Sequence, residues 1–183
     1  MVMSVRMTES RLRARLADGS LTGMWRLDPA RSGVNLHTKS VWGLVAVKGV
    51  FAEVTGEGAL ADDGRISGRI TVAAASIDTR NSKRDVHLHS ADLLDSEAHP
   101  HIVFTAERIT PAGDQATVAG TLRIHGRTRP ITFPVTITAS GDDEVHIEGE
   151  VQVDRSDFGL TWNQLGMASM KNTITVSAVF LRH

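Results

Sequence analysis

A two-residue alternation of apolar and polar side chains limits the folds open to this chain more than any other feature. It recurs in five segments of the sequence, at residues 66–72, 116–125, 131–138, 145–153 and 174–180. Each segment has one apolar and one polar face, as expected of an antiparallel sheet that meets solvent on one side. Turns rich in Gly and Asp separate several of these runs. The sequence therefore predicts a chain built mainly of antiparallel β-strands.

Several long strands in one sheet would leave exposed edges, and closure into a barrel is the simplest way to remove them. Gly68, Gly120 and Gly149 lie inside the alternating segments. Glycine within a strand suits the sharp bends that a barrel requires. We therefore predict an all-β fold in which the sheet closes into an antiparallel barrel.

Two segments break the alternation. Residues 81–98 have no period of two, and the leucines among them fit short helical turns that Pro100 would end. We expect a short helical insertion there, placed to cover one end of the barrel. Residues 1–23 form an N-terminal extension in which Thr8 to Ala17 could be helical, with Thr8 as the N-cap. We expect this extension to be solvated or loosely packed, and residues 24–183 to form one barrel domain.

Composition excludes several classes of function. The 183 residues contain 20 basic and 21 acidic side chains, a balance that argues against nucleic-acid binding. The absence of cysteine excludes disulfides, thiolate nucleophiles and cysteine-ligated metal centres. No apolar stretch is long enough for a transmembrane helix or a secretory signal. We expect a soluble, cytoplasmic protein with no cofactor.

Four of the eight histidines lie close together in the sequence, as His87, His89, His99 and His101. Two His-x-His pairs beside acidic residues could in principle bind zinc, copper or nickel. The first pair falls in the expected helical segment, where a spacing of two is a poor geometry for shared ligation. We favour surface or capping histidines, and we keep a metal-dependent enzyme or metal sensor as an alternative.

Two basic segments follow strands, one with Arg127 and Arg129 and the other with Arg155. Each can be a solvated turn or a strand end with local charge pairing. The functional interpretation is that these arginines attract an anionic head group at the mouth of the barrel.

Several segments, taken in order, resemble the YceI-like polyisoprenoid-binding family. The resemblance begins at Trp25–Pro29, is most specific over Lys83–Asp95, and returns at Gly126–Pro130 and Arg155–Gly159. It implies an extended, about eight-stranded, lipocalin-like β-barrel. It also implies that the barrel holds an isoprenoid lipid, such as a polyprenyl phosphate or a quinone, without catalysis. Some members of the family form dimers, so a homodimer is a further expectation.

These expectations name two sets of residues. Apolar candidates for the barrel lining are Trp42, Phe51, Leu93, Leu94, Phe104, Leu122, Phe133, Val135, Phe158 and Trp162. Head-group candidates are Arg84, His87, His89, Arg127, Arg129 and Arg155. The leading hypothesis is a non-enzymatic carrier or store for an isoprenoid-like lipid. The alternatives are the histidine-based metal protein and a stress-linked scaffold for a protein partner, which a large exposed apolar patch without an internal cavity would favour.

Overall fold

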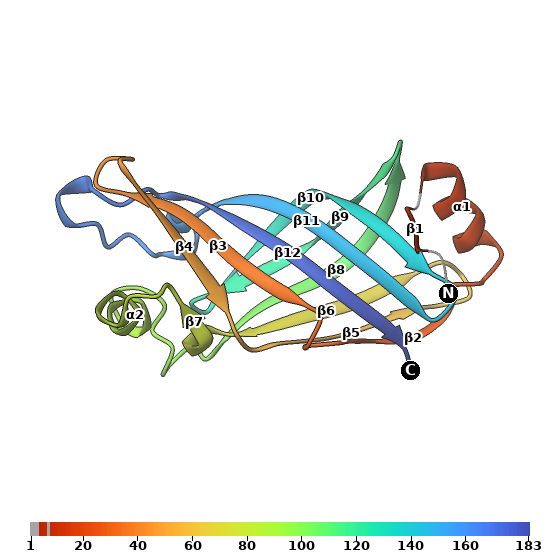
Figure 1. Ribbon diagram of the computed structural model, residues 1–183, viewed down its shortest axis with the longest axis horizontal. Helices are drawn as coiled ribbons and strands as arrows, with labels where there is room; N and C mark the ends of the chain where they lie inside the picture. Colours follow the sequence, from red (N-terminus) through yellow and green to blue (C-terminus); the bar gives the residue numbers. More distant parts are fainter. Residues whose placement is uncertain (1–3, 7) are drawn as a thin grey trace.

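The computed structural model describes residues 4–6 and 8–183 of the chain. Within these residues a single antiparallel sheet is wrapped into a barrel, with one helix near each end (Figure 1). Its strands are β1 Ser4–Arg6, β2 Gly23–Leu27, β3 Gly33–Ser40, β4 Val45–Phe51, β5 Val54–Leu60, β6 Ile66–Ala73, β7 Ile77–Asp78, β8 His101–Ala112, β9 Gln115–Ile124, β10 Arg127–Ser140, β11 Glu144–Asp154 and β12 Lys171–Arg182.

Eight of these strands close the barrel. Following the hydrogen-bonded neighbours, the ring runs β2, β5, β6, β8, β9, β10, β11, β12 and back to β2, and every pairing is antiparallel. The C-terminal strand β12 makes the closure, because it pairs with β11 along its length and with β2 at its end. The all-β, eight-stranded antiparallel barrel predicted from the sequence is confirmed.

Strand β1 pairs with the end of β10 near α1, and β3, β4 and β7 lengthen the opposite end of the barrel. Strand β12 pairs with β2 through Phe180–Arg182 and with β3 through Thr173–Ser177, so β3 continues the same edge after a turn. Strands β4 and β7 then extend the sheet beyond β3. The barrel is therefore longer on this side, where the β3–β4 hairpin projects (Figure 1).

One of the predicted bend glycines has a clear steric reason. A Cβ atom at Gly120 would lie far inside van der Waals distance of the carbonyl oxygen of Thr105. The neighbouring pairing of β8 with β9 shifts register between Ala106 and Arg108, which marks a β-bulge. Only glycine permits this close approach of two backbones at the bend.

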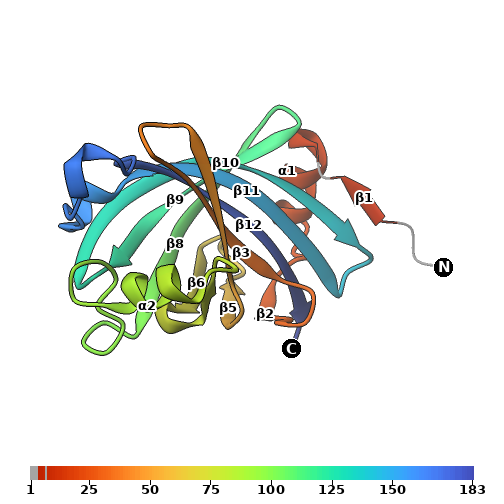
Figure 2. The same ribbon diagram turned by 60° about the vertical axis from the view of Figure 1, so that its left-hand side comes forward.

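Helix α2 (Ser82–His89) occupies the expected insertion, and turns follow it up to the start of β8. The Asn81 side chain accepts a hydrogen bond from the Arg84 amide and caps the helix. Helix α2 lies at one end of the barrel and α1 (Glu9–Ala17) at the other in both views (Figures 1 and 2). No helix in the described part of the chain is long and apolar enough to cross a membrane.

The N-terminal extension differs from its expectation. The helix begins after Thr8, as predicted, but its Leu12 side chain is only 3% exposed and packs in a core cluster with Leu21 and Trp25. The indole Nε1 of Trp25 donates a hydrogen bond to the Leu21 carbonyl, which fixes the segment that leads into the barrel. The extension is therefore not loosely packed: α1 is docked on the end of the barrel.

Candidate functional site: the barrel cavity

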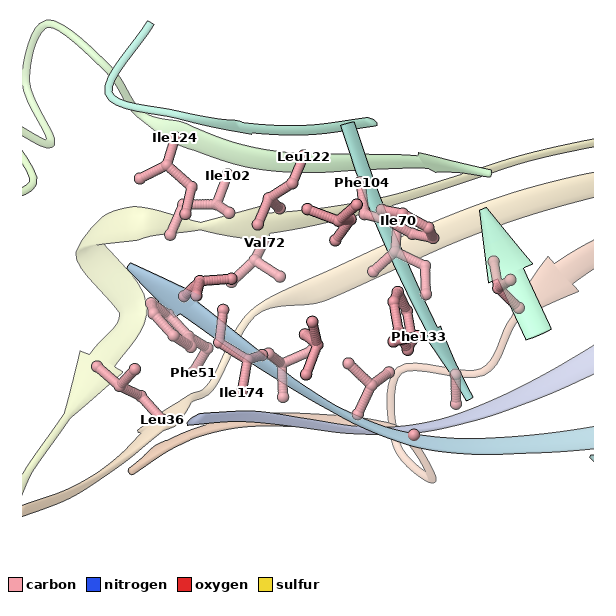
Figure 3. Close-up of a pocket in the computed structure, with 18 of the residues that line it drawn as sticks. Leu36, Phe51, Ile70, Val72, Ile102, Phe104, Leu122, Ile124, Phe133 and Ile174 are labelled. Atoms are coloured by element: carbon pink, nitrogen blue, oxygen red, sulfur yellow. The ribbon is translucent and has the colours of Figure 1, made fainter. Parts of the chain in front are cut away.

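The barrel encloses a cavity of about 460 Å³. In strands β6, β8 and β9, every second side chain faces the cavity. The register between these strands brings the inward-facing side chains side by side: Ile70 lies opposite Phe104, and Phe104 lies opposite Leu122. Figure 3 shows these side chains converging on the space with Val72 and Ile174. The volume falls within the range of about 300–1,000 Å³ common for small-molecule sites.

The cavity exists because the inward-facing side chains do not reach one another across the barrel. Ile70, Phe104 and Ile174 point inward yet are only half-buried, since part of their surface faces the empty space. The large rings gather instead at the wall, where Phe104 and Phe133 pack with centroids 5.5 Å apart at 58°. The lining is consequently apolar and suited to a hydrocarbon chain.

Several polar groups of the lining, among them Thr79, Arg84, His87 and Arg155, lie where α2 covers the barrel. The most unusual is Arg155, in the short 3-10 helix Arg155–Phe158, whose side chain is only 8% exposed. Its Nε donates to the Ser169 carbonyl at 3.1 Å, but its Nη2 has no hydrogen-bond partner among the described residues. Burial lowers the pKa of Arg155, although the charge of Asp154 opposes that shift. A buried guanidinium with a free donor is costly unless an anion reaches it.

Arg84 also lines the cavity, but its guanidinium is engaged by the protein. Its Nε donates to Thr79 Oγ1 at 2.8 Å and its Nη2 donates to the Thr79 carbonyl at 2.9 Å. The Thr79 hydroxyl in turn donates to Asp85 Oδ1 at 2.5 Å. These bonds tie α2 to Thr79, the residue directly after strand β7, so Arg84 holds the cover in place.

His87 lies beside the same end of the cavity. Its ring makes an edge contact with Trp162, with centroids 4.3 Å apart at 86°. Its Nε2 is 3.9 Å from a carboxylate oxygen of Asp92. The contact with Trp162 joins α2 to the segment that follows Arg155, and both residues line the cavity.

The structure places most of the predicted lining residues on the cavity wall. They are Phe51, Leu93, Leu94, Phe104, Leu122, Phe133, Val135, Phe158 and Trp162. Trp42 differs: it lies in the β3–β4 turn with a φ of 52°, and its side chain is 66% exposed. The expectation that Trp42 lines the barrel is corrected, because the residue belongs to the hairpin turn, where the alternation of the strands does not extend.

Sequence reasoning missed other parts of the wall. Ile70, Val72 and Ile174 line the cavity but were not among the predicted lining residues. Each lies on the apolar face of an alternating segment, so the alternation could have identified them. Leu12 and Leu16 of α1 also line the cavity. Their four-residue spacing indicated a helix, but nothing in the local sequence indicated which surface that helix would cover.

The head-group candidates fall into two groups. Arg84, His87 and Arg155 lie on the cavity lining. Arg127 and Arg129 are exposed on the β9–β10 hairpin: Arg127 packs against Gly159, and Arg129 donates to the Thr128 carbonyl. The buried Nε2 of His89 has no partner among the described residues, and His89 is not part of the lining.

The four clustered histidines do not form one site in the described structure. His99 instead meets Asp95 and His125, and the potential ligand atoms of these three residues all lie within 4.8 Å of one another. His125 comes from the β9–β10 turn, which lies far away in the sequence. The predicted set of His87, His89, His99 and His101 is therefore replaced by a different trio at the rim.

Exposed apolar side chains also occur near this end. Trp42 and Leu44 in the β3–β4 turn are 66% and 82% exposed, and Leu165 is 77% exposed. The Trp42 amide donates to the Met167 carbonyl at 3.1 Å, which brings the two segments together. A scaffold for a protein partner would be favoured by an exposed apolar patch without an internal cavity. This molecule has an internal cavity, so the structure does not favour that alternative.

Comparison with known proteins identifies the family of this chain. The model of the YceI-like domain family matches residues 25–180. Protein YceI of Escherichia coli O157:H7 and that of Salmonella arizonae are each 31% identical over 113 residues. The aligned segment is 59% of this chain and spans 59% of the length of those curated relatives.

Solved structures show the same fold. The crystal structure of Burkholderia cenocepacia BcnA matches with a TM-score of 0.75 and 23% identity, over 84% of this chain and 98% of that one. A polyisoprenoid binding domain from Saccharophagus degradans, implicated in plant cell wall breakdown, matches with a TM-score of 0.71 and 13% identity. That match covers 87% of this chain and 98% of the other. At these identities the similarity concerns the fold.

Proposed function

Because this chain belongs to the YceI-like domain family, we propose that it binds a single isoprenoid-like lipid inside its barrel, without catalysis, and carries or stores it. The observation that carries the proposal is the apolar cavity of about 460 Å³ within a closed barrel. Transfer of apolar surface from water into such a space contributes roughly 25 cal/mol per Å². The lipid-binding description of the Saccharophagus degradans domain, which shares the fold, agrees with this proposal.

Arg155 favours a lipid with an anionic head group over a neutral one. Its buried Nη2 has no hydrogen-bond partner within residues 4–6 and 8–183, and phosphate oxygens accept strong, charge-assisted hydrogen bonds from arginine. A polyprenyl phosphate would place its chain in the cavity and its phosphate beside Arg155. A quinone offers only neutral carbonyl oxygens, which compensate a buried charge less well.

The test starts with the purified protein. Native mass spectrometry and organic extraction should recover one lipid per chain. Delipidated protein is then titrated with a polyprenyl phosphate, the polyprenol of equal chain length and a quinone of similar length. We expect the polyprenyl phosphate to bind most tightly. Failure of all three to bind would refute the proposal, and equal affinity for the three would refute the role of the head group.

A cavity-blocking variant provides the matched test. Ile70→Trp places a bulky ring in the middle of the lining, whereas Thr55→Trp adds the same ring to an exposed position on the neighbouring strand β5. We expect Ile70→Trp to weaken polyprenyl phosphate binding at least about tenfold, and Thr55→Trp to leave it unchanged. Equal binding by both variants would place the lipid outside the barrel.

A further inference from the structure

We propose that Asp95, His99 and His125 form a binding site for a divalent transition-metal ion such as zinc. The site lies at the rim of the barrel, where the turns after α2 meet the β9–β10 turn. It is separate from the lipid cavity, because none of the three residues belongs to the cavity lining. The inference therefore does not depend on which lipid the barrel holds.

The local backbone brings the first two ligands together. The His99 amide donates to the Asp95 carbonyl at 2.7 Å, which closes a helix-like turn. With Asp95 in a left-handed conformation at the start of this turn, its carboxylate and the His99 ring place their ligand atoms within 4.8 Å of one another. The sequence Asp-x-x-x-His at 95–99 thus supplies two ligands from one short segment.

The third ligand comes from a distant part of the chain. The rings of His99 and His125 have centroids 4.6 Å apart at 59°, and the ligand atoms of the trio lie within 4.8 Å of one another. The ring of His99 also packs against the backbone of Gly126, where a Cβ would approach its Cε1 to 2.9 Å. Glycine at this position lets the imidazole sit against the turn that carries His125.

In the described part of the chain, the side chains of Asp95, His99 and His125 make no side-chain hydrogen bond or ion pair, so no protein partner competes for them there. Asp95 and His125 also have positive φ angles of 45° and 51°. Such left-handed conformations of non-glycine residues cost free energy and concentrate at functional sites.

The chemistry of the donors selects the class of ion. Two imidazole nitrogens and one carboxylate oxygen suit zinc and its first-row neighbours, whereas calcium and magnesium prefer oxygen ligands alone. Three protein ligands leave a coordination position for water or another small ligand, as in open zinc sites. An ion bound here would also link the turn after α2 to the β9–β10 hairpin.

The test uses the 183-residue chain without a polyhistidine tag, delipidated and treated with a chelator. Calorimetric titration with zinc chloride should show one ion per chain with micromolar or tighter affinity. Cobalt(II) should give the visible absorption of a low-coordinate nitrogen and oxygen site. We expect His99→Gln and His125→Gln each to weaken zinc binding at least about tenfold and to abolish the cobalt spectrum.

His101→Gln is the matched control, since His101 is exposed on β8, two residues from His99, and lies outside the trio. It should bind zinc as the unmodified protein does. Circular dichroism on each variant separates loss of the site from loss of the fold, and Asp95→Asn, a near-isosteric change, supplies an independent test. Absence of zinc binding in the unmodified protein, or equal weakening in His101→Gln, would overturn the proposal. Lipid binding is measured separately, so the two proposals can fail independently.

Discussion

At the scale of single residues, the polar groups around the cavity divide into those that hold the structure and those that are left without a protein partner. Arg84 donates hydrogen bonds to Thr79, whereas no residue that the structure describes accepts one from the buried Nη2 of Arg155. The sequence marked both as head-group candidates because residue type and position are visible in it. The hydrogen-bond partners that separate the two roles are Thr79, directly after β7, and Ser169, and their proximity to the two arginines depends on the fold.

Replacing Arg155 with Met should change lipid preference more than stability. The loss of a charge-assisted hydrogen bond to a buried anion costs about 1.5–3 kcal/mol, so polyprenyl phosphate affinity should fall at least about tenfold. Affinity for the neutral polyprenol should stay the same or rise, because an uncompensated charge is removed from the lining. Titration of both lipids checks this, with Arg129→Met as the exposed control. Parallel losses for both lipids would argue against a head-group role.

Thr79 is the buried centre of the bonds that hold α2. It is only 5% exposed, and its hydroxyl connects Asp85 with Arg84. Thr79→Val keeps the shape of the side chain but leaves these groups unsatisfied, so we expect a loss of about 1–3 kcal/mol in the free energy of unfolding. Urea denaturation measures it, and Thr128→Val on the exposed hairpin should be nearly neutral. A neutral Thr79→Val would show that α2 is held mainly by apolar contacts.

At the scale of secondary-structure elements, the sequence predicted strands better than contacts between elements. The alternating segment 66–72 became β6 (Ile66–Ala73), and the segment 145–153 became most of β11 (Glu144–Asp154), because each has one face toward the interior. The helix at Thr8–Ala17 was also predictable from its N-cap and its leucine spacing. The packing of this helix against the barrel was not predictable. Its apolar face consists of only two leucines, and that face is large enough to bury only because the end of the barrel is small. The metal trio was hidden for a similar reason, since His125 comes from a distant turn.

The docking of α1 makes Leu12 a test of whether the extension belongs to the barrel. Leu12→Ala removes a buried side chain from the cluster with Leu21 and Trp25, and we expect a loss of about 2–4 kcal/mol in the free energy of unfolding. Arg11→Ala changes the exposed neighbour and should be close to neutral. Chemical denaturation of the two variants makes the comparison. A negligible effect of Leu12→Ala would mean that α1 contributes little to the folded state.

At the scale of the whole molecule, the closed barrel and its cavity have opposite effects on stability. Closure through β12 satisfies the strand edges of the ring, whereas the cavity leaves apolar side chains such as Ile70 and Ile174 without full packing against other protein atoms. A cavity of about 460 Å³ therefore forgoes contacts that a filled core would make. A lipid that occupies it restores them, so the folded state of this chain and its ligand should be thermodynamically linked.

That linkage predicts a stability shift whose size follows from mass action. A ligand that binds only the native state stabilises it by about 2.7 kcal/mol when its free concentration is 100 times Kd. Adding polyprenyl phosphate to the delipidated protein should therefore raise Tm progressively with concentration, as followed by calorimetry. Ile70→Trp, which occupies the cavity, should lose this dependence, while Thr55→Trp should keep it. If all three proteins gained Tm equally, the lipid would be acting on the outer surface, and the linkage between the cavity and folding would not hold.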